Sequence, residues 1–152
     1  MDLILWRHAE AEEGELDLER RLTPKGHKQA RRMATWLGSQ LPESCKILVS
    51  PAQRALQTVA PLGRKFKVVP ALAPNASAQD ILHAANWPKG RAAVLLVGHQ
   101  PTLGQAAALL LCGQVQDWNI KKGNIWWIAQ SDPLDPASRF LRAVMAPKLI
   151  VK

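Results

Sequence analysis

The chain contains no tyrosine and only two phenylalanines among its 152 residues, although it has six tryptophans. Proteins that bind single-stranded nucleic acid commonly stack bases on aromatic side chains, and little such material is present here. No nucleic-acid-binding motif accompanies the net charge of +8, which comes from 20 Lys and Arg residues against 12 Asp and Glu. We therefore expect no nucleic-acid partner; the positive charge is also compatible with an anionic membrane surface or with phosphorylated and acidic substrates.

Cysteine and long apolar segments are also scarce. The two cysteines, Cys45 and Cys112, lie far apart and show no CxxC spacing, which indicates reduced, buried thiols in the cytoplasm. No apolar run approaches the roughly 20 residues that span a bilayer. The segment 1–6 is too short for a signal peptide and carries Asp2 in place of a basic start. The sequence predicts a cytoplasmic protein with no membrane partner, folded as one domain over residues 1–152.

Apolar strands alternate with helices along most of the chain. Thr23 followed by Pro24 is a typical helix start, and Ser77 with Asp80 forms a capping-box-like pattern for another helix. Hydrophobic periodicity predicts strands over residues 2–7, 46–49, 66–69, 92–97, 124–130 and 139–146, and helices over 24–40, 51–64, 77–86 and 101–111. This alternation predicts an α/β fold: a single three-layer domain with a mostly parallel central sheet, helices on both faces and a C-terminal antiparallel hairpin.

Reactive side chains follow three of the predicted strands. Arg7 and His8 end the first strand, Ser50 and Arg54 follow the second, and His99 follows the strand at 92–97. In open α/β sheets, ligands bind in the crevice outside the carboxyl ends of the strands. We therefore expect two histidines and two arginines to converge on one edge of the sheet.

These residue types suit an anion better than a metal ion. Two histidines without Asp, Glu or Cys ligands at metal spacing make a poor metal site, and arginines repel a cation. Guanidinium groups donate paired hydrogen bonds to phosphate oxygens. A neutral imidazole is a nucleophile toward phosphorus, and neighbouring cations lower its pKa so that a lone pair stays available at neutral pH. The sequence therefore predicts a metal-free site for a phosphoryl group or another oxyanion.

Four motifs, in this order along the chain, resemble the histidine phosphatase superfamily, in the branch with an Arg-His-Gly signature. They are Leu5-Trp6-Arg7-His8-Ala9, Arg21-Leu22-Thr23-x-x-Gly26, Ser50-Pro51-x-x-Arg54-Ala55-x-Gln57-Thr58 and Val97-Gly98-His99-x-Pro101. The short length and the strand-end spacing are most similar to the SixA-type protein-phosphohistidine phosphatases. The resemblance implies a phosphoglycerate mutase-like fold.

The resemblance also implies a role for each matching residue. His8 is the expected nucleophile and carries a phosphohistidine intermediate, which water then hydrolyses. Arg7, Arg54 and His99 are expected to clamp the phosphoryl oxygens, and Arg21 is expected to join them from the loop before the first helix. Ser50 is a further expected substrate contact. No metal and no organic cofactor is implied.

The sequence departs from the signature at Ala9, where the family usually has glycine. If that position requires a positive φ, alanine is strained there; otherwise one methyl group is a mild change, which is what we expect.

A second departure concerns the general acid. Family members place a Glu after the third strand, within the stretch that is 70–74 here, or an acidic residue after the second histidine, where this chain has Gln100. A phosphate ester needs its leaving alkoxide protonated, whereas the imidazole of phosphohistidine can leave already carrying a proton. The missing acid therefore favours a phosphoramidate substrate. The remaining candidate proton donors are Glu10, Glu12, Glu13 and Asp80.

Three functions stay open at this point. The first is a phosphatase for phosphohistidine on a protein, which the short chain favours because it leaves no room for a helical insertion over the site. The second is a small-molecule phosphomonoesterase for a sugar phosphate or nucleotide, and the third is a phosphoprotein-binding module without activity. A basic helix face could dock an acidic partner or could simply be solvated; its residues are Lys25, Lys28, Arg31 and Arg32.

Overall fold

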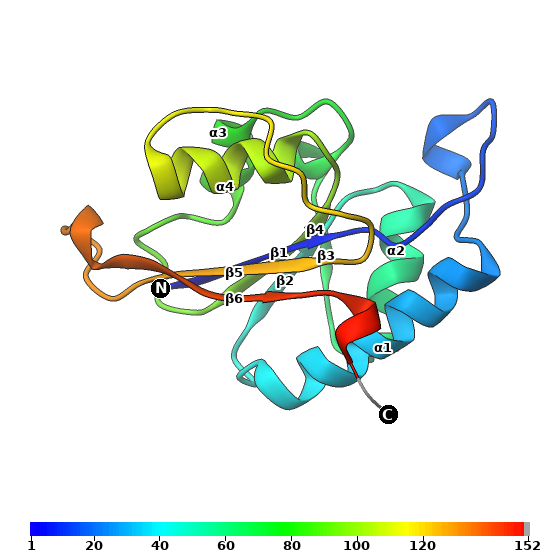
Figure 1. The fold of residues 1–152 in the computed structure, drawn as a ribbon, viewed down its shortest axis with the longest axis horizontal. Helices are drawn as coiled ribbons and strands as arrows, with labels where there is room; N and C mark the ends of the chain where they lie inside the picture. Colours follow the sequence, from blue (N-terminus) through cyan, green and yellow to red (C-terminus); the bar gives the residue numbers. More distant parts are fainter. Residues whose placement is uncertain (151–152) are drawn as a thin grey trace.

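The computed structural model describes residues 1–150 of the chain (Figure 1). Its centre is a six-stranded sheet with the strand order β3-β2-β4-β1-β5-β6. The strands are β1 (Asp2–Arg7), β2 (Lys46–Val49), β3 (Lys67–Val68), β4 (Val94–Gly98), β5 (Ile125–Gln130) and β6 (Arg139–Met145). The helices are α1 (Pro24–Gln40), α2 (Gln53–Val59), α3 (Ala78–Ala84) and α4 (Thr102–Cys112).

The strands β3, β2, β4 and β1 run parallel, so their carboxyl ends lie at one edge of the sheet. Val49 at the end of β2 pairs with Val97, and Arg7 at the end of β1 pairs with Gly98. β5 pairs antiparallel with β1, and β6 forms the C-terminal antiparallel hairpin with β5. The predicted fold class is confirmed: the sheet is mostly parallel, with helices on both faces and an antiparallel hairpin at the end.

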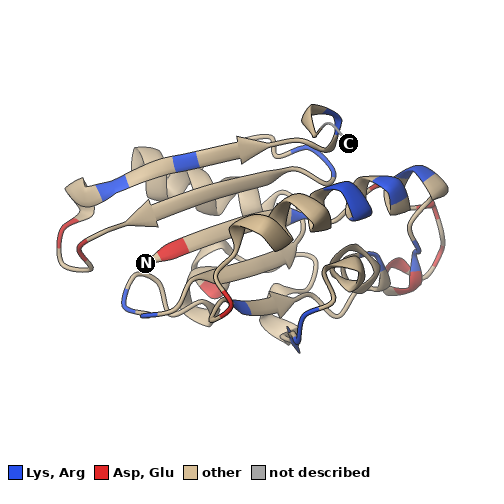
Figure 2. Ribbon diagram, turned by 90° about the horizontal axis from the view of Figure 1, so that it is seen from below, with Lys and Arg blue, Asp and Glu red and all other residues tan. Residues whose placement is uncertain are grey.

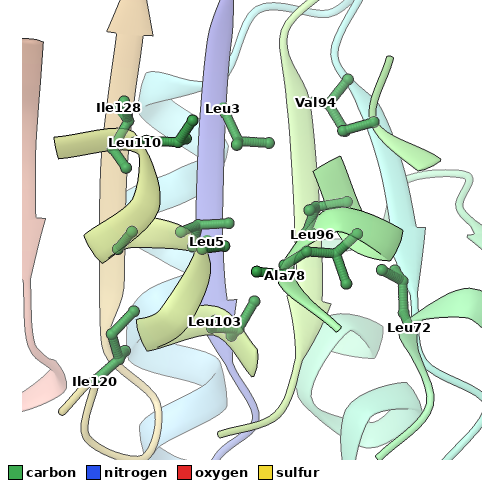
Figure 3. Close-up of a cluster of buried hydrophobic side chains, with 14 residues drawn as sticks. Leu3, Leu5, Leu72, Ala78, Val94, Leu96, Leu103, Leu110, Ile120 and Ile128 are labelled. Atoms are coloured by element: carbon green, nitrogen blue, oxygen red, sulfur yellow. The ribbon is translucent and has the colours of Figure 1, made fainter. Parts of the chain in front are cut away.

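Alternation of side chains along the strands divides the core between the two faces of the sheet. Leu3 and Leu5 of β1 point into a cluster that α3 and α4 cover (Figure 3). Ile4 and Trp6 point to the opposite face, where α1 and α2 lie (Figure 1). Because both faces are covered, β1 is buried from Leu3 to Trp6, and the loops after β1, β2 and β4 are held at fixed positions.

The two predicted helix starts are confirmed. The side chain of Thr23 accepts a hydrogen bond from the amide of Gly26 at the start of α1. Ser77 and Asp80 form a reciprocal capping box at the start of α3. These caps satisfy amides that the first helical turn leaves without partners.

The helix predicted over residues 51–64 is shorter in the structure. α2 ends at Val59, and a 3-10 turn follows over Ala60–Leu62. Pro61 has no amide hydrogen to donate, and Gly63 adopts a φ of 68°, which ends the helical run.

Both cysteines are free thiols, Cys45 half-buried and Cys112 exposed. The expectation of a buried thiol is wrong for Cys112, because it is the last residue of α4, where the helix ends at Gly113. Within residues 1–150, no helix combines the length and the apolar character needed to cross a membrane.

Candidate active site

The carboxyl edge of the sheet brings together the segments that the sequence singled out. The amide of His8, just after β1, donates to the carbonyl of Gly98 at 3.1 Å, which joins the ends of β1 and β4. The amide of Ser50, just after β2, donates to the carbonyl of Val97 at 3.0 Å. The ring centroids of His8 and His99 lie 5.1 Å apart, with the ring planes inclined by 54°. The two histidines therefore share one site.

His8 has the protonation state that a nucleophile needs. The residue is 7% exposed, and its Nδ1 lies 2.7 Å from the carbonyl oxygen of Ala9. Because a carbonyl oxygen only accepts, Nδ1 carries the hydrogen and Nε2 keeps its lone pair. Burial lowers the pKa of His8 to about 4, although the hydrogen bond to Ala9 opposes this shift. The charges of Arg54, Arg7 and Arg20 act in the same direction as burial.

His99 is also neutral, and it offers a donor to the site. Its Nε2 lies 2.7 Å from the hydroxyl of Ser50, and that hydroxyl already accepts a bond from the amide of Ala52. This favours Ser50 as the donor to Nε2, which leaves the ring hydrogen on Nδ1. Nδ1 is buried and has no hydrogen-bond partner within residues 1–150. Burial, followed by the charges of His8 and Arg54, lowers the pKa of His99 to about 3.

Arg54 lies under the loop that precedes α1, residues 8–23. Its side chain is almost completely buried, and one terminal nitrogen donates to the carbonyl oxygen of Asp17 at 2.6 Å. The other donates to the Asp17 carboxylate at 3.1 Å. Asp17 belongs to the 3-10 turn Asp17–Glu19, and its side chain is 53% exposed. Sequence reasoning missed Asp17, because a residue in an acidic surface loop shows no pattern that links it to Arg54.

Thr58 lies between the segment that carries His8 and the helix that carries Arg54. Its hydroxyl is fully buried, accepts from the amide of Ala9 at 3.0 Å and donates to the carbonyl of Arg54 at 2.7 Å. The loop after β1 is thereby fixed to α2. Thr58 lies within the third motif quoted above, and its position there was the available signal.

Arg7 contributes a half-buried guanidinium beside His8. One terminal nitrogen donates to the carbonyl of Ile120 at 2.9 Å, and burial lowers the pKa of Arg7. Its Nε, like the Nε of Arg54, is buried without a hydrogen-bond partner in the described part of the chain. Donors of this kind are costly unless a ligand satisfies them.

Arg21 is exposed and lines a surface hollow together with Arg20 and with acidic residues of the preceding loop, Glu12 and Glu19 among them. Its neighbour Arg20 is the residue of this loop whose charge lowers the pKa of His8. Arg20 also bonds to the Asp17 carboxylate at 3.1 Å.

Alanine fits at the signature position without backbone strain. In residues 1–150, the residues other than glycine with a positive φ are Asn75 and Asn86, so Ala9 is not in the left-handed region. Its methyl group is fully buried against Leu22 and Ala30. The mild outcome expected for this departure is confirmed.

The carboxylates that the sequence left open as proton donors have other partners or lie on the surface. The carboxylate of Glu10 accepts from the hydroxyl of Thr23 at 2.7 Å, and Asp80 closes the capping box of α3. Glu12 and Glu13 are exposed. The carboxylate next to the site is that of Asp17. Slight burial raises its pKa, but hydrogen bonds from Arg54 and Arg20 hold that pKa below its ordinary value.

The donor set therefore suits an oxyanion. No group of three or more His, Cys, Asp or Glu side chains within residues 1–150 is placed to hold a metal ion. A lone pair on His8 lies beside two guanidinium groups and the Nδ1 of His99, and these are donors that match phosphoryl oxygens.

These features define a class: an α/β phosphatase built around two histidines at the carboxyl edge of its sheet. The chain belongs to the histidine phosphatase superfamily (branch 1), whose family model matches residues 3–77. Phosphohistidine phosphatase SixA of Escherichia coli (strain K12) is 32% identical over 123 residues, which cover 75% of this chain and 76% of SixA.

Solved structures agree with this assignment. The protein histidine phosphatase SixA complexed with tungstate superposes with a TM-score of 0.79 at 27% identity, over 99% of this chain and 100% of that chain. A phosphoserine phosphatase mutant from Entamoeba histolytica in complex with phosphoserine superposes with a TM-score of 0.72 at 16% identity, over 99% of both chains. The second likeness shows a common fold alone.

Proposed function

We propose that the protein hydrolyses phosphohistidine on a partner protein through a covalent phosphohistidine at His8. The observation that carries the proposal is the fixed tautomer of His8. Its Nδ1 is bonded to the Ala9 carbonyl, so its Nε2 lone pair is available, and its pKa of about 4 keeps the ring neutral at physiological pH. The relationship to SixA, a phosphohistidine phosphatase, supports the same substrate class.

The reaction has two balanced steps. Nε2 of His8 attacks phosphorus, the phosphorus–nitrogen bond of the substrate breaks, and the substrate imidazole leaves as a neutral ring that keeps its own hydrogen. Phospho-His8 then carries a positive ring with its hydrogen on Nδ1. Water attacks phosphorus, the bond to Nε2 breaks, and dihydrogen phosphate leaves together with neutral His8.

Positive groups around His8 stabilise the transferring phosphoryl group in this proposal. Arg7 and Arg54 supply buried guanidinium donors, and His99 supplies Nδ1, held by the contact of its Nε2 with Ser50. Ser50 then acts on the substrate through His99. From the loop before α1, Arg20 is better placed than Arg21 to add charge, because it is the one that affects the pKa of His8.

The shortage of proton donors near the site favours phosphohistidine over a phosphate ester as substrate. Gln100 stands where an acid could follow the second histidine, and its amide group bonds to the amide of Gly104 and the carbonyl of Trp118. The carboxylate of Asp17 is held ionised by two arginines, so it is a poor proton donor. Phosphohistidine needs no such donor, whereas an alkoxide loses roughly 100- to 10,000-fold without one.

The test compares leaving groups. Phosphate release is measured from free phosphohistidine, from a phosphohistidine-bearing protein and from phosphoserine, an alkyl phosphate ester, with the His8→Ala protein as control. We expect rapid release from both phosphoramidates, slow release from the ester and none from the variant. Efficient ester turnover would point instead to a small-molecule phosphomonoesterase. Equal rates for the native and variant proteins on every substrate would leave a binding module.

A further inference from the structure

A groove of about 520 Å³ opens beside the candidate active site. Arg7 belongs to both the groove and the candidate active site. The loop before β5 also contacts the active site, because the amide of Gly123 donates to the carbonyls of Arg7 and His8 at 3.1 and 3.0 Å. Besides Arg7 and Glu10, from the end of β1 and the segment after it, the groove is lined from three parts of the chain that are far apart in sequence: the start of α1, the loop before β5 and the turn after β6.

The groove is strongly basic. Besides Arg7, each of its three walls contributes exposed lysine, namely Lys25, Lys121, Lys122 and Lys148. Glu10 is the acidic lining residue, and its carboxylate already accepts the hydroxyl of Thr23. Figure 2 shows basic residues along α1 and near the C-terminal turn. Since lysines from separate segments repel one another across the groove, a bound anionic chain relieves that repulsion.

A second flank of the site, the loop before α1, is rich in acidic residues (Figure 2). Four of them line one surface hollow together with Arg20 and Arg21: Glu12, Glu13, Glu15 and Glu19. An acidic partner is repelled on that flank and attracted on the lysine flank. The charges around the site therefore orient the partner as well as attract it.

We propose that this groove binds an acidic segment of the substrate protein that lies next to the phosphohistidine. The inference rests on the proposed function and adds the chemistry of the partner to it. Of the basic residues on α1, Lys25 lines the groove together with lysines from two other segments. Lys28 and Arg31 of the same helix do not line it.

The test uses two phosphohistidine peptides of equal length, one with Asp and Glu around the phosphohistidine and one with Ser and Gly, together with free phosphohistidine. The groove variant replaces Lys121, Lys122 and Lys148 with Glu. A matched control replaces three exposed lysines with Glu in another basic hollow, of about 510 Å³, which begins at the amino end of β2: Lys46, Lys65 and Lys67.

We expect the groove variant to lose about tenfold or more in kcat/KM on the acidic peptide, mainly through KM, and to act normally on the neutral peptide and on free phosphohistidine. The control variant keeps native kcat/KM on all three substrates. An equal loss on all three substrates, an unchanged rate on the acidic peptide, or the same loss in the control variant would overturn the proposal.

Binding of the acidic peptide to the His8→Ala protein, measured by calorimetry at low and high salt, separates the groove from the chemistry. Salt-dependent binding that the three groove substitutions abolish supports the groove even if the native protein releases no phosphate. In that case the proposed phosphatase function fails and the docking surface stands. If the native protein releases phosphate rapidly but the His8→Ala protein shows no salt-dependent binding of the acidic peptide, the phosphatase function stands and the docking surface fails.

Discussion

Asp17 and Arg54 form a two-point contact at the mouth of the site: the backbone carbonyl and the carboxylate of Asp17 accept from the two terminal nitrogens of the Arg54 guanidinium, at 2.6 and 3.1 Å. A phosphoryl group would engage the same guanidinium, whose Nε is buried without a partner within residues 1–150. An anion that binds His8 and Arg54 must therefore share Arg54 with Asp17 or displace it.

Replacing Asp17 with Asn removes the competing charge, so oxyanions should bind more tightly. Since the carboxylate is half-exposed, the pair contributes little, and we expect a decrease of a few-fold in the Kd for tungstate. Calorimetric titration with tungstate measures this. Glu19→Gln removes one charge from the same turn without touching Arg54 and serves as the control. Weaker tungstate binding by Asp17→Asn than by the native protein would show that Asp17 holds Arg54 in place instead of competing for it.

The pH dependence of kcat/KM should follow the lowered pKa of His8. The nucleophile is the neutral ring, so the acid limb of the profile should fall as pH drops through a pKa of about 4. An ordinary histidine would lose activity near 6.5. The measurement is the initial rate on the neutral phosphohistidine peptide at a series of pH values between about 3.5 and 8. The His8→Ala protein is the blank for spontaneous hydrolysis. A half-maximal rate at pH 6 to 7 would contradict the burial argument.

The same two histidines should make the free energy of unfolding depend on pH. The pKa values of His8 and His99 are lowered to about 4 and about 3 in the folded protein, so the unfolded chain binds more protons as pH falls below about 6.5. The free energy of unfolding should therefore decrease as pH falls from about 6.5 toward 4. Urea unfolding at several pH values measures this slope. His99→Gln should make the slope shallower, and an unchanged slope would show that His99 does not titrate as described.

Thr58 should act as a positioning residue. Thr58→Val leaves the amide of Ala9 and one acceptor site of the Arg54 carbonyl without their partner, which should lower the free energy of unfolding by about 1–3 kcal/mol. It should also lower kcat on phosphohistidine by about tenfold or more, because His8 and Arg54 lose their common anchor. Thr58→Ser keeps the hydroxyl and should restore kcat. A valine variant that is destabilised but has native kcat would limit Thr58 to a structural role.

Some contacts of the site could be predicted from the sequence and others could not. The meeting of His8, Ser50 and His99 was predictable, since parallel strands place their carboxyl ends at one edge and each residue directly follows a strand. Asp17 was not, because its contact with Arg54 depends on how a long polar loop folds back over α2. The helix predicted over 51–64 ends early because of Pro61 and Gly63, whose effects hydrophobic periodicity does not include.

Arg21 illustrates a different limit. A motif match assigns it to the phosphate, yet its side chain is exposed beside acidic residues while Arg20 faces Asp17. The two neighbouring arginines line the same hollow, and sequence alone does not say which of them bonds to Asp17. The basic groove was also beyond prediction, because its lysines come from three segments that only the fold brings together.

The most direct test of the central claim is to trap the phosphorylated protein. The native protein is mixed with a phosphohistidine donor and quenched in base, under which phosphohistidine survives, and the modified residue is located by mass spectrometry of its peptides. The account predicts one phosphoryl group on His8 that appears and decays within turnover and is absent from His8→Ala. Phosphate release without any modified residue, or a phosphoryl group on His99 instead, would contradict it.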